Sequence, residues 1–273
     1  MPLQIDRYVV IGNPIGHSKS PLIHHMFAEQ TQQNLDYQAL LVPLGGFEQT
    51  VSELFANGLR GCNITIPFKQ EAWAFAQQLS SYAQTAGALN TLMIRPDQSI
   101  YGHNTDGLGM MRDLLVNKQV AIKGKKVLVL GAGGAVRGII QPLAEAEPAK
   151  IVLANRTAAT AVELANDFSK FGEVHGGGFE AINDSFDLII NGTAASLQGE
   201  MPDLPPNCLV EGGCCYDMMY GNEPTPFMRW AYENRAAQVF DGIGMLIEQA
   251  AEAFELWRGI RPDTQPVFAA LTK

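Results

Sequence analysis

Cysteine is scarce in this sequence, and its spacing suits neither a disulfide framework nor a metal site. The chain of 273 residues has four cysteines, and no two of them form the C-x-x-C pair of thiolate metal sites. Two of them, Cys214 and Cys215, are adjacent and therefore poor disulfide partners. We expect buried, reduced thiols and no bound metal.

Positive charge and long apolar runs are also lacking. The chain has 19 Lys and Arg against 28 Asp and Glu, and this net charge of −9 argues against nucleic acid or an anionic membrane as the main partner. No stretch approaches the roughly 20 apolar residues of a membrane helix. The first residues have neither the basic start nor the apolar run of a signal peptide, so we expect a cytoplasmic location.

Apolar segments alternate with segments of helical period along almost the whole chain, which is typical of α/β proteins. The length suffices for two domains. We predict strands near residues 8–11, 37–42, 61–64, 88–94, 187–190 and 209–214, and helices near residues 21–32, 47–56, 68–78, 105–117 and 243–258. The last helix places Gln249 on one stripe with Met245 and Ala253, so Gln249 faces a packed or ligand-facing surface.

Residues 127–138 (VLVLGAGGAVRG) predict a buried strand, a glycine turn and the start of a helix. Gly131 and Gly133 would form the turn, while Gly134 and Ala135 would begin a helix whose free N–H groups can bind a pyrophosphate. A plain turn between a strand and a helix is the alternative interpretation.

The following apolar segment, residues 151–157 (IVLANRT), ends roughly 20 residues after the turn, where dinucleotide-binding proteins contact the ribose. NAD-binding proteins usually have Asp or Glu there, whereas this chain has Asn155, Arg156 and Thr157. A carboxylate would repel a 2′-phosphate and an arginine fork can bind one, so the pattern favours NADP.

Residues 12–21 (GNPIGHSKSP) follow the first predicted strand. Ser20 is a natural N-cap and Pro21 a natural first helical residue. Ser18 precedes them, and two hydroxyls at a helix N-terminus would also suit a carboxylate. A capping turn and an anion site both stay open here.

Lys69 ends the segment 63–69 (NITIPFK), in which Pro67 can begin a helix. The positive end of a helix dipole disfavours a cation in the first turn, which suits a lysine for proton transfer near neutral pH. A solvated surface lysine is the alternative.

Asp106 lies in the segment 102–107 (GHNTDG), where the first turn of another helix would favour its carboxylate. It either stabilises that helix or pairs with Lys69 and holds the ammonium group in place. The neighbouring His103 is interpreted as a structural or solvent-facing residue.

Together these segments resemble the shikimate dehydrogenase family, and the resemblance covers nearly the whole chain. Several motifs in the right order and spacing identify a family far better than one. The matching segments are residues 12–21, 63–69, 87–91 (GALNT), 104–107 (NTDG), 131–135 (GAGGA), 155–157 (NRT), 216–220 (YDMMY) and 241–245 (DGIGM).

The resemblance implies two α/β domains separated by a cleft: a substrate domain (residues 1–104 plus 241–273) and a Rossmann-type NADP-binding domain (residues 105–240). It implies the reversible NADPH-dependent reduction of 3-dehydroshikimate to shikimate, in chorismate and aromatic amino-acid biosynthesis, by a monomer or homodimer. A dual-specificity quinate/shikimate dehydrogenase is the alternative. A further alternative is a non-catalytic dinucleotide sensor. Such a protein would have a cofactor cleft without Lys69 and Asp106, and the presence of both residues argues against it.

By the same resemblance, Lys69 and Asp106 match the catalytic pair. The residues that match substrate contacts are Ser18, Ser20, Thr65, Lys69, Asn90, Asp106, Tyr220 and Gln249. Those that match cofactor contacts are Gly131, Ala132, Gly133, Gly134, Ala135, Asn155, Arg156, Thr157, Met218 and Gly242. Thr160 stands where many relatives have a second arginine, which would leave Arg156 alone on the 2′-phosphate.

Overall fold

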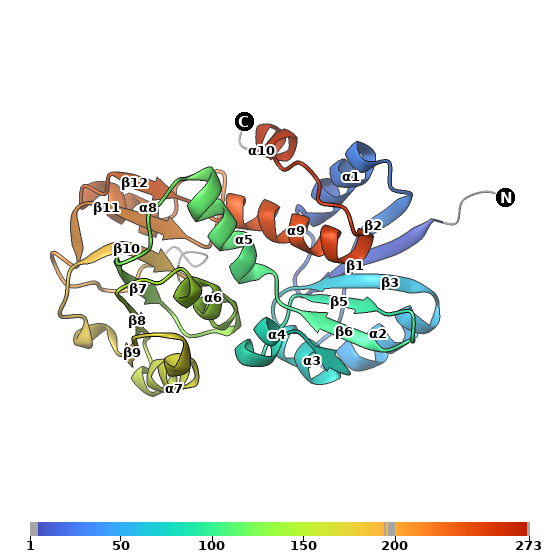
Figure 1. The fold of residues 1–273 in the computed structure, drawn as a ribbon, viewed down its shortest axis with the longest axis horizontal. Helices are drawn as coiled ribbons and strands as arrows, with labels where there is room; N and C mark the ends of the chain where they lie inside the picture. Colours follow the sequence, from blue (N-terminus) through green and yellow to red (C-terminus); the bar gives the residue numbers. More distant parts are fainter. Residues whose placement is uncertain (1–4, 194, 196–199, 272–273) are drawn as a thin grey trace. The chain divides into compact units, whose positions relative to one another are not determined.

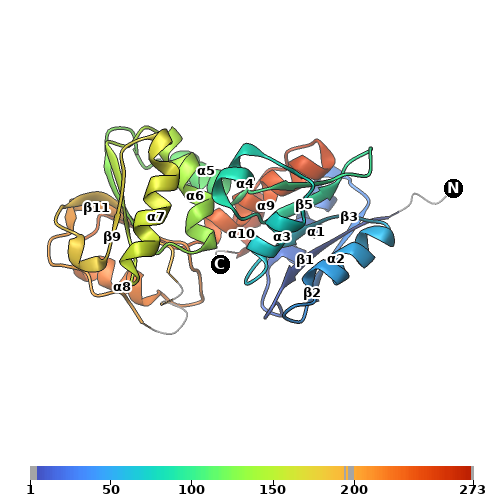
Figure 2. The ribbon, with the colours of Figure 1, turned by 90° about the horizontal axis from the view of Figure 1, so that it is seen from below.

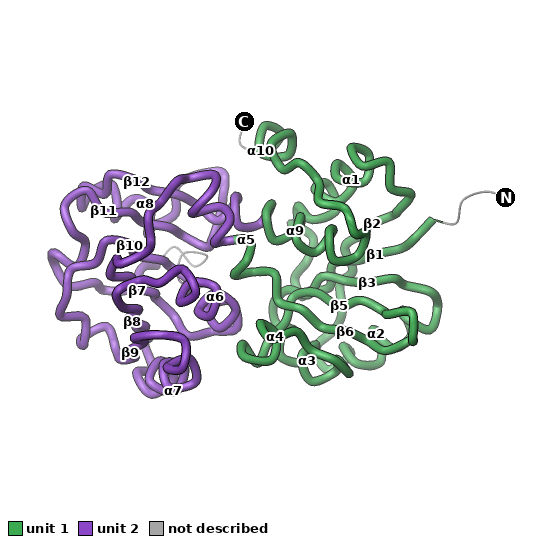
Figure 3. The backbone as a smooth tube through the Cα atoms, viewed as in Figure 1, with its two compact units in different colours: residues 1–109, 247–273 green, residues 110–246 purple. Residues whose placement is uncertain are grey.

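The computed structural model describes residues 5–193, 195 and 200–271 (Figure 1, and turned by 90° in Figure 2). The chain forms two compact units, the first made of residues 1–109 and 247–273 and the second of residues 110–246 (Figure 3). Each unit has its own six-stranded sheet with helices packed on it, which confirms the predicted fold class of two α/β domains. Among the described residues, no helix is both long and apolar enough to cross a membrane.

The first unit is built on a mixed sheet with the strand order β2-β1-β3-β5-β6-β4. β1 pairs in parallel with β2 and β3, whereas β5 is antiparallel to both β3 and β6. The strands are β1 (Asp6–Gly12), β2 (Leu35–Leu41), β3 (Leu59–Ile64), β4 (Gln78–Leu79), β5 (Thr91–Ile94) and β6 (Ile100–His103). The helices are α1 (Ser20–Thr31), α2 (Phe47–Ala56), α3 (Lys69–Phe75), α4 (Ser81–Ala86), α10 (Gln265–Leu271) and most of α9 (Ile243–Arg258).

Helices cover both faces of this sheet. Since successive side chains of a strand point to opposite faces, one strand contributes to both cores. Val9 and Ile11 of β1 belong to a core that includes Phe47 of α2 and Phe68 next to α3. Tyr8 of β1 lies on the other face, with Tyr37 of β2 and Trp257 of α9. In Figure 1, α1 and α9 accordingly lie on one side of the sheet and α2, α3 and α4 on the other.

The second unit has an entirely parallel sheet with the order β12-β11-β10-β7-β8-β9. From the β9 edge, the strands follow the chain as 3-2-1-4-5-6, the doubly wound order in which dinucleotides bind where the order reverses, here between β7 and β10. The strands are β7 (Lys126–Leu130), β8 (Lys150–Ala154), β9 (Val174–Gly177), β10 (Phe186–Asn191), β11 (Leu209–Asp217) and β12 (Gln238–Phe240).

Apolar residues on both faces explain why β7 reads as a continuous hydrophobic run. Val127 and Val129 pack in a core with α6 and α7, while Leu128 and Leu130 pack in another with Phe227 of α8. Figure 2 shows α6 and α7 on one face of the sheet and α8 on the other. The helical elements are α6 (Gly134–Glu145), α7 (Ala158–Phe168), α8 (Pro226–Glu233), the C-terminal end of α5 (Asp106–Arg112, whose first four residues belong to the first unit), a π-helical turn η1 (Asp113–Asn117) and the short 3₁₀ turns η2 (Ser169–Phe171) and η3 (Phe179–Ala181).

Several short elements differ from the sequence-based expectations. The helix expected over residues 68–78 ends at Phe75, and residues 78–79 form β4 instead. The strand expected over residues 88–94 begins only at Thr91. The helix α4 and the strand β6 were not predicted, because four to six residues are too few to show a hydrophobic period. The helix expected over residues 105–117 changes to π-helical geometry after Arg112.

The chain passes from one unit to the other inside two helices, after residue 109 in α5 and after residue 246 in α9. The domain boundaries expected from the sequence lie shortly before these helices, after residue 104 in the loop between β6 and α5 and after residue 240 at the end of β12. The four cysteines are all buried and form no disulfide, as expected for reduced structural thiols.

Within the first unit, α5 and α9 come together at Gly109. A Cβ atom at this position would lie 2.4 Å from the backbone nitrogen of Gln249 and 2.7 Å from its Cα. Because these are backbone atoms, they cannot rotate away as a side chain can. Only glycine therefore permits this approach of the two helices.

We expect Gly109→Ala to lower the free energy of unfolding by roughly 1–3 kcal/mol, as overpacked core positions do. Urea denaturation of the purified protein measures this. Gly172→Ala is the control, because a Cβ there meets no described atom within 4 Å and the backbone is extended (φ 162°). Wild-type stability of Gly109→Ala would show that α5 and α9 do not pack this closely.

Candidate active site

Lys69 and Asp106, which are 37 residues apart in the chain, form an ion pair in the first unit. Each is the first residue of its helix, Lys69 of α3 and Asp106 of α5. Lys69 Nζ lies 2.5 Å from Asp106 Oδ2, and the side chains are only 15% and 7% exposed. The alternative of a solvated surface lysine is therefore wrong.

Two amide side chains complete this cluster. Asn90, at the end of the loop before β5, donates from Nδ2 to Asp106 Oδ1 at 2.8 Å and to Gln249 Oε1 at 3.0 Å. Gln249 is buried on α9, which confirms that this stretch of the helix turns it inward. The four residues Lys69, Asn90, Asp106 and Gln249 are called the Lys69 cluster below. Its shielded ammonium group can donate a proton, and its amides can bind hydroxyl groups.

The serines of residues 12–21 lie at the start of α1, but not as expected. The predicted N-cap role of Ser20 is wrong: α1 begins at Ser20, and Lys19 occupies the N-cap position without a side-chain cap bond. The Ser18 hydroxyl instead accepts a hydrogen bond from the Ser20 N–H at 3.3 Å. The local turn geometry therefore engages Ser18, while the Ser20 side chain is buried.

Thr65 follows β3 and lies next to the end of β1. Its N–H donates to Ile11 O at 2.9 Å, and a Cβ at Gly12 would lie 2.5 Å from Thr65 Cγ2. The absence of a side chain at Gly12 lets the loops that follow these two parallel strands run side by side.

In the second unit, the glycine segment after β7 forms the predicted turn and helix start. Gly131 has φ +103°, a backbone conformation that favours glycine, and Gly134 begins α6. Gly133 is the N-cap residue and leaves the first N–H groups of the helix without a side-chain cap. A Cβ at Gly133 would meet no described atom within 4 Å, so the backbone here is open to a ligand. This helix start suits a pyrophosphate.

Asn155, Arg156 and Thr157 follow β8, the direct neighbour of β7. Asn155 Nδ2 donates to Thr157 O at 3.1 Å, and Thr157 occupies the N-cap position of α7 without capping it. The side chain of Arg156 is exposed, as is Thr160 one turn along. This end of β8 therefore presents one guanidinium group next to an uncapped helix.

Met218 and Gly242, far apart in the chain, meet after β11. The Gly242 N–H donates to Met219 O at 2.9 Å, and a Cβ at Gly242 would lie 2.2 Å from Met218 O. Tyr220 follows in the same loop, and burial raises the pKa of its hydroxyl. Tyr220 thus belongs to the second unit, whereas the other residues expected to contact substrate belong to the first.

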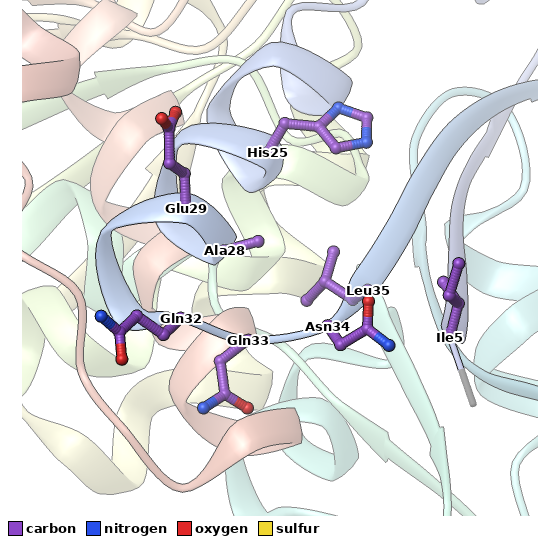
Figure 4. A pocket seen from close by; sticks show the side chains of 8 residues that line it. All are labelled: Ile5, His25, Ala28, Glu29, Gln32, Gln33, Asn34 and Leu35. Carbon is purple, nitrogen blue, oxygen red and sulfur yellow. The ribbon is translucent and has the colours of Figure 1, made fainter. Parts of the chain in front are cut away.

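A surface hollow next to the C-terminal end of α1 shares no residue with the Lys69 cluster (Figure 4). It is lined by Ile5, His25, Ala28, Glu29, Gln32, Gln33, Asn34 and Leu35. These side chains include no paired cation and carboxylate of the kind found at Lys69.

The sequence alone did not point to several buried polar residues near the Lys69 cluster, among them Tyr37, Asn63 and Thr91. Asn63 and Thr91 lie within segments that carry the family resemblance. The available signal was a polar side chain in a strand whose neighbours are apolar and buried.

Family models match three parts of the chain. A model described as the shikimate dehydrogenase substrate binding domain matches residues 10–92. Models described as shikimate / quinate 5-dehydrogenase and as the shikimate 5′-dehydrogenase C-terminal domain match residues 114–198 and 242–272.

Relatives match almost the full length. The shikimate dehydrogenase (NADP(+)) of Cellvibrio japonicus is 56% identical over 98% of this chain and 97% of its own. The chain belongs to the shikimate dehydrogenase family. Among solved structures, an Ael1 enzyme from Pseudomonas putida has a TM-score of 0.92 at 44% identity, covering 97% of this chain and 98% of that chain. Shikimate 5-dehydrogenase from Thermus thermophilus in complex with NADP(H) and shikimate has a TM-score of 0.86 at 31% identity, covering 97% and 98%.

His24 of α1 is fully buried and stacks on Tyr37, with ring centroids 4.1 Å apart and planes 6° from parallel. Burial lowers the pKa of His24 to about 3, so the ring is neutral in the folded protein. The unfolded chain takes up a proton on this residue near pH 6.5. The resulting stabilisation is complete above about pH 6.5 and is lost as the pH falls toward about 3.

We therefore expect His24→Phe, which keeps an aromatic ring at this position, to make stability less dependent on pH. Below pH 6.5, the difference in the free energy of unfolding between His24→Phe and wild type should change by up to about 1.4 kcal/mol per pH unit. Urea denaturation at pH 7.5, 6 and 5 measures it, with exposed His175→Gln as the control. An identical pH dependence in wild type and His24→Phe would contradict a buried neutral imidazole.

Proposed function

We propose that this member of the shikimate dehydrogenase family catalyses the reversible NADPH-dependent reduction of 3-dehydroshikimate to shikimate. The observation that carries the proposal is the Lys69–Asp106 pair, shielded from water and hydrogen-bonded through Asn90 to Gln249. The relatives named as NADP-dependent shikimate dehydrogenases, and the Thermus enzyme with NADP(H) and shikimate bound, support the choice of substrate and cofactor. A cytoplasmic location and a monomeric or homodimeric state stay predictions from the sequence.

Lys69 handles the proton in this mechanism. In the reduction, its ammonium group donates a proton to the alkoxide that develops from the ring ketone, and in the oxidation its neutral amine accepts the hydroxyl proton. The Asp106 carboxylate holds the ammonium group in place through Oδ2. NADPH, when bound, supplies the hydride that the ketone carbon receives.

The remaining polar groups of the site bind and orient the substrate. Ser18 and Ser20, at the start of α1, receive the substrate carboxylate. The ring hydroxyls and carboxylate are further contacted by Thr65, Asn90, Asp106, Tyr220 and Gln249. The amides of Asn90 and Gln249 can both donate and accept, which suits hydroxyl groups.

The second unit fits the cofactor. The backbone of Gly131, Ala132, Gly133, Gly134 and Ala135 holds the pyrophosphate, because the N–H groups of α6 are uncapped and the space at Gly133 is open. Asn155, Arg156 and Thr157 hold the 2′-phosphate. Met218 and Gly242, which lie in contact, are assigned to the nicotinamide end.

A four-way assay tests this function: NADP⁺ or NAD⁺ is combined with shikimate or quinate, and nicotinamide absorbance is followed. We expect strong turnover only with NADP⁺ and shikimate. Comparable rates with quinate would assign the dual specificity instead, and no turnover in any combination would overturn the proposal.

The reverse assay, in which NADPH or NADH reduces 3-dehydroshikimate, tests the 2′-phosphate contact through Arg156→Ala. Loss of a charged hydrogen-bond donor should raise KM for NADPH roughly 10- to 100-fold and change KM for NADH little. Arg229→Ala on α8 replaces another exposed arginine outside the cofactor segments and should leave both values unchanged. Equal effects of Arg156→Ala on the two cofactors would contradict the contact.

Lys69→Ala tests the proton step. Because positioned acid–base groups contribute about 10²- to 10⁴-fold, kcat should fall by that factor with little change in KM. The matched control is Lys123→Ala, which removes an exposed lysine paired with Glu147 at 2.7 Å. Near-normal kcat in Lys69→Ala would remove Lys69 from the proton step.

A further inference from the structure

Tyr37, Asn63 and Thr91 form a chain of hydrogen bonds that ends at Asn90. The Tyr37 hydroxyl donates to Asn63 Oδ1 at 2.7 Å, and Asn63 Nδ2 donates to Thr91 Oγ1 at 3.0 Å. The Thr91 hydroxyl then donates to Asn90 Oδ1 at 2.9 Å. All four residues are at most 5% exposed, so water does not replace these partners.

Backbone groups at two points set the direction of this chain. Asn63 Nδ2 also donates to the carbonyl oxygen of Asn90 at 3.2 Å, so the Asn63 oxygen must face the Tyr37 hydroxyl. The N–H of Thr105 donates to Asn90 Oδ1 at 2.9 Å, so the Asn90 nitrogen must face away from Thr91. Because a carbonyl can only accept and an N–H only donate, neither amide can be reversed without losing these bonds.

The consequence reaches the Lys69 cluster directly. With its oxygen occupied by Thr91 and Thr105, Asn90 presents its NH₂ group to Asp106 Oδ1 and Gln249 Oε1. A reversed amide would place an oxygen against the Asp106 carboxylate. The Asn90 NH₂ group, which helps to hold Asp106 beside Lys69, is thus oriented by the hydrogen bonds of Tyr37, Asn63 and Thr91.

We propose that Tyr37, Asn63 and Thr91 are positioning residues that hold the Asn90 amide in its substrate-binding orientation, a role that rests on the proposed function of the site. Tyr37 anchors the far end, because its ring is stacked on the neutral ring of His24. Burial raises the pKa of the Tyr37 hydroxyl well above its ordinary value, and a weaker hydrogen-bonding contribution from Ser20 lowers it, so the group stays a donor.

Thr91 allows the cleanest test, since one pair of substitutions separates the hydroxyl from the packing. Thr91→Val keeps the side-chain shape and removes the link, while Thr91→Ser keeps the link. Thr91→Val should raise KM for shikimate roughly three- to tenfold, the size expected when one neutral hydrogen bond is lost. KM for NADP⁺ should stay within twofold of the wild-type value. In Thr91→Ser, KM for shikimate should lie close to the wild-type value.

Tyr37→Phe removes the first donor, and the chain contains a matched control for it. Tyr8 pairs with Tyr37 across β1 and β2, belongs to the same core and is 3% exposed, but its hydroxyl contacts Arg258 instead of Asn63. Tyr37→Phe should raise KM for shikimate as Thr91→Val does. Tyr8→Phe should leave it unchanged, even where both variants lower Tm.

All variants are assayed well below their Tm, so that loss of folded enzyme lowers apparent kcat without changing KM. Wild-type KM for shikimate in both Thr91→Val and Tyr37→Phe would overturn the positioning role. It would also be overturned if KM for shikimate rose as much in Thr91→Ser as in Thr91→Val, or if KM for NADP⁺ rose as much as KM for shikimate. Failure of the proposed function is distinguishable, because the wild-type protein would then not turn over shikimate at all.

Discussion

The ion pair between Lys69 and Asp106 is the contact on which the Lys69 cluster depends most. Both side chains are largely removed from water, and a buried charge that lacks a partner costs several kcal/mol. Lys69 also lies at the start of α3, where the helix dipole opposes its charge, whereas the dipole of α5 favours Asp106. The carboxylate therefore compensates an otherwise unfavourable cation, and Asn90 occupies its second oxygen.

Within each unit, glycines allow a close approach of segments that are far apart in the chain. Gly12 and Gly109 in the first unit, and Gly242 in the second, each lie where a Cβ would meet a neighbouring segment at 2.2–2.5 Å. At these points two loops, two helices, or a loop and a helix start come into contact. The neighbouring segments include Thr65, Gln249 and Met218, which are assigned to the substrate or the cofactor, so the glycines help to place these residues.

Local signals predicted a large part of the fold and the site. The glycine turn, the starts of α3 and α5, and the inward stripe of α9 were all evident from residue types within one or two helical turns. The exceptions were local as well: α1 begins at Ser20 instead of being capped by it, and β4, α4 and β6 are too short to show a period. This shift of one residue makes Lys19 the N-cap, while Ser18 accepts a hydrogen bond from the Ser20 N–H.

By itself, the sequence determined the alternation of strands and helices, the family, and which residues have the right chemistry. Only the tertiary structure decided which of these residues touch. Lys69 and Asp106 are 37 residues apart, and Asn63 faces Thr91 only because β3 and β5 pair in that register. The physical reason is range: capping, turns and helical period act over a few residues, whereas ion pairs and buried hydrogen bonds join segments that packing alone brings together.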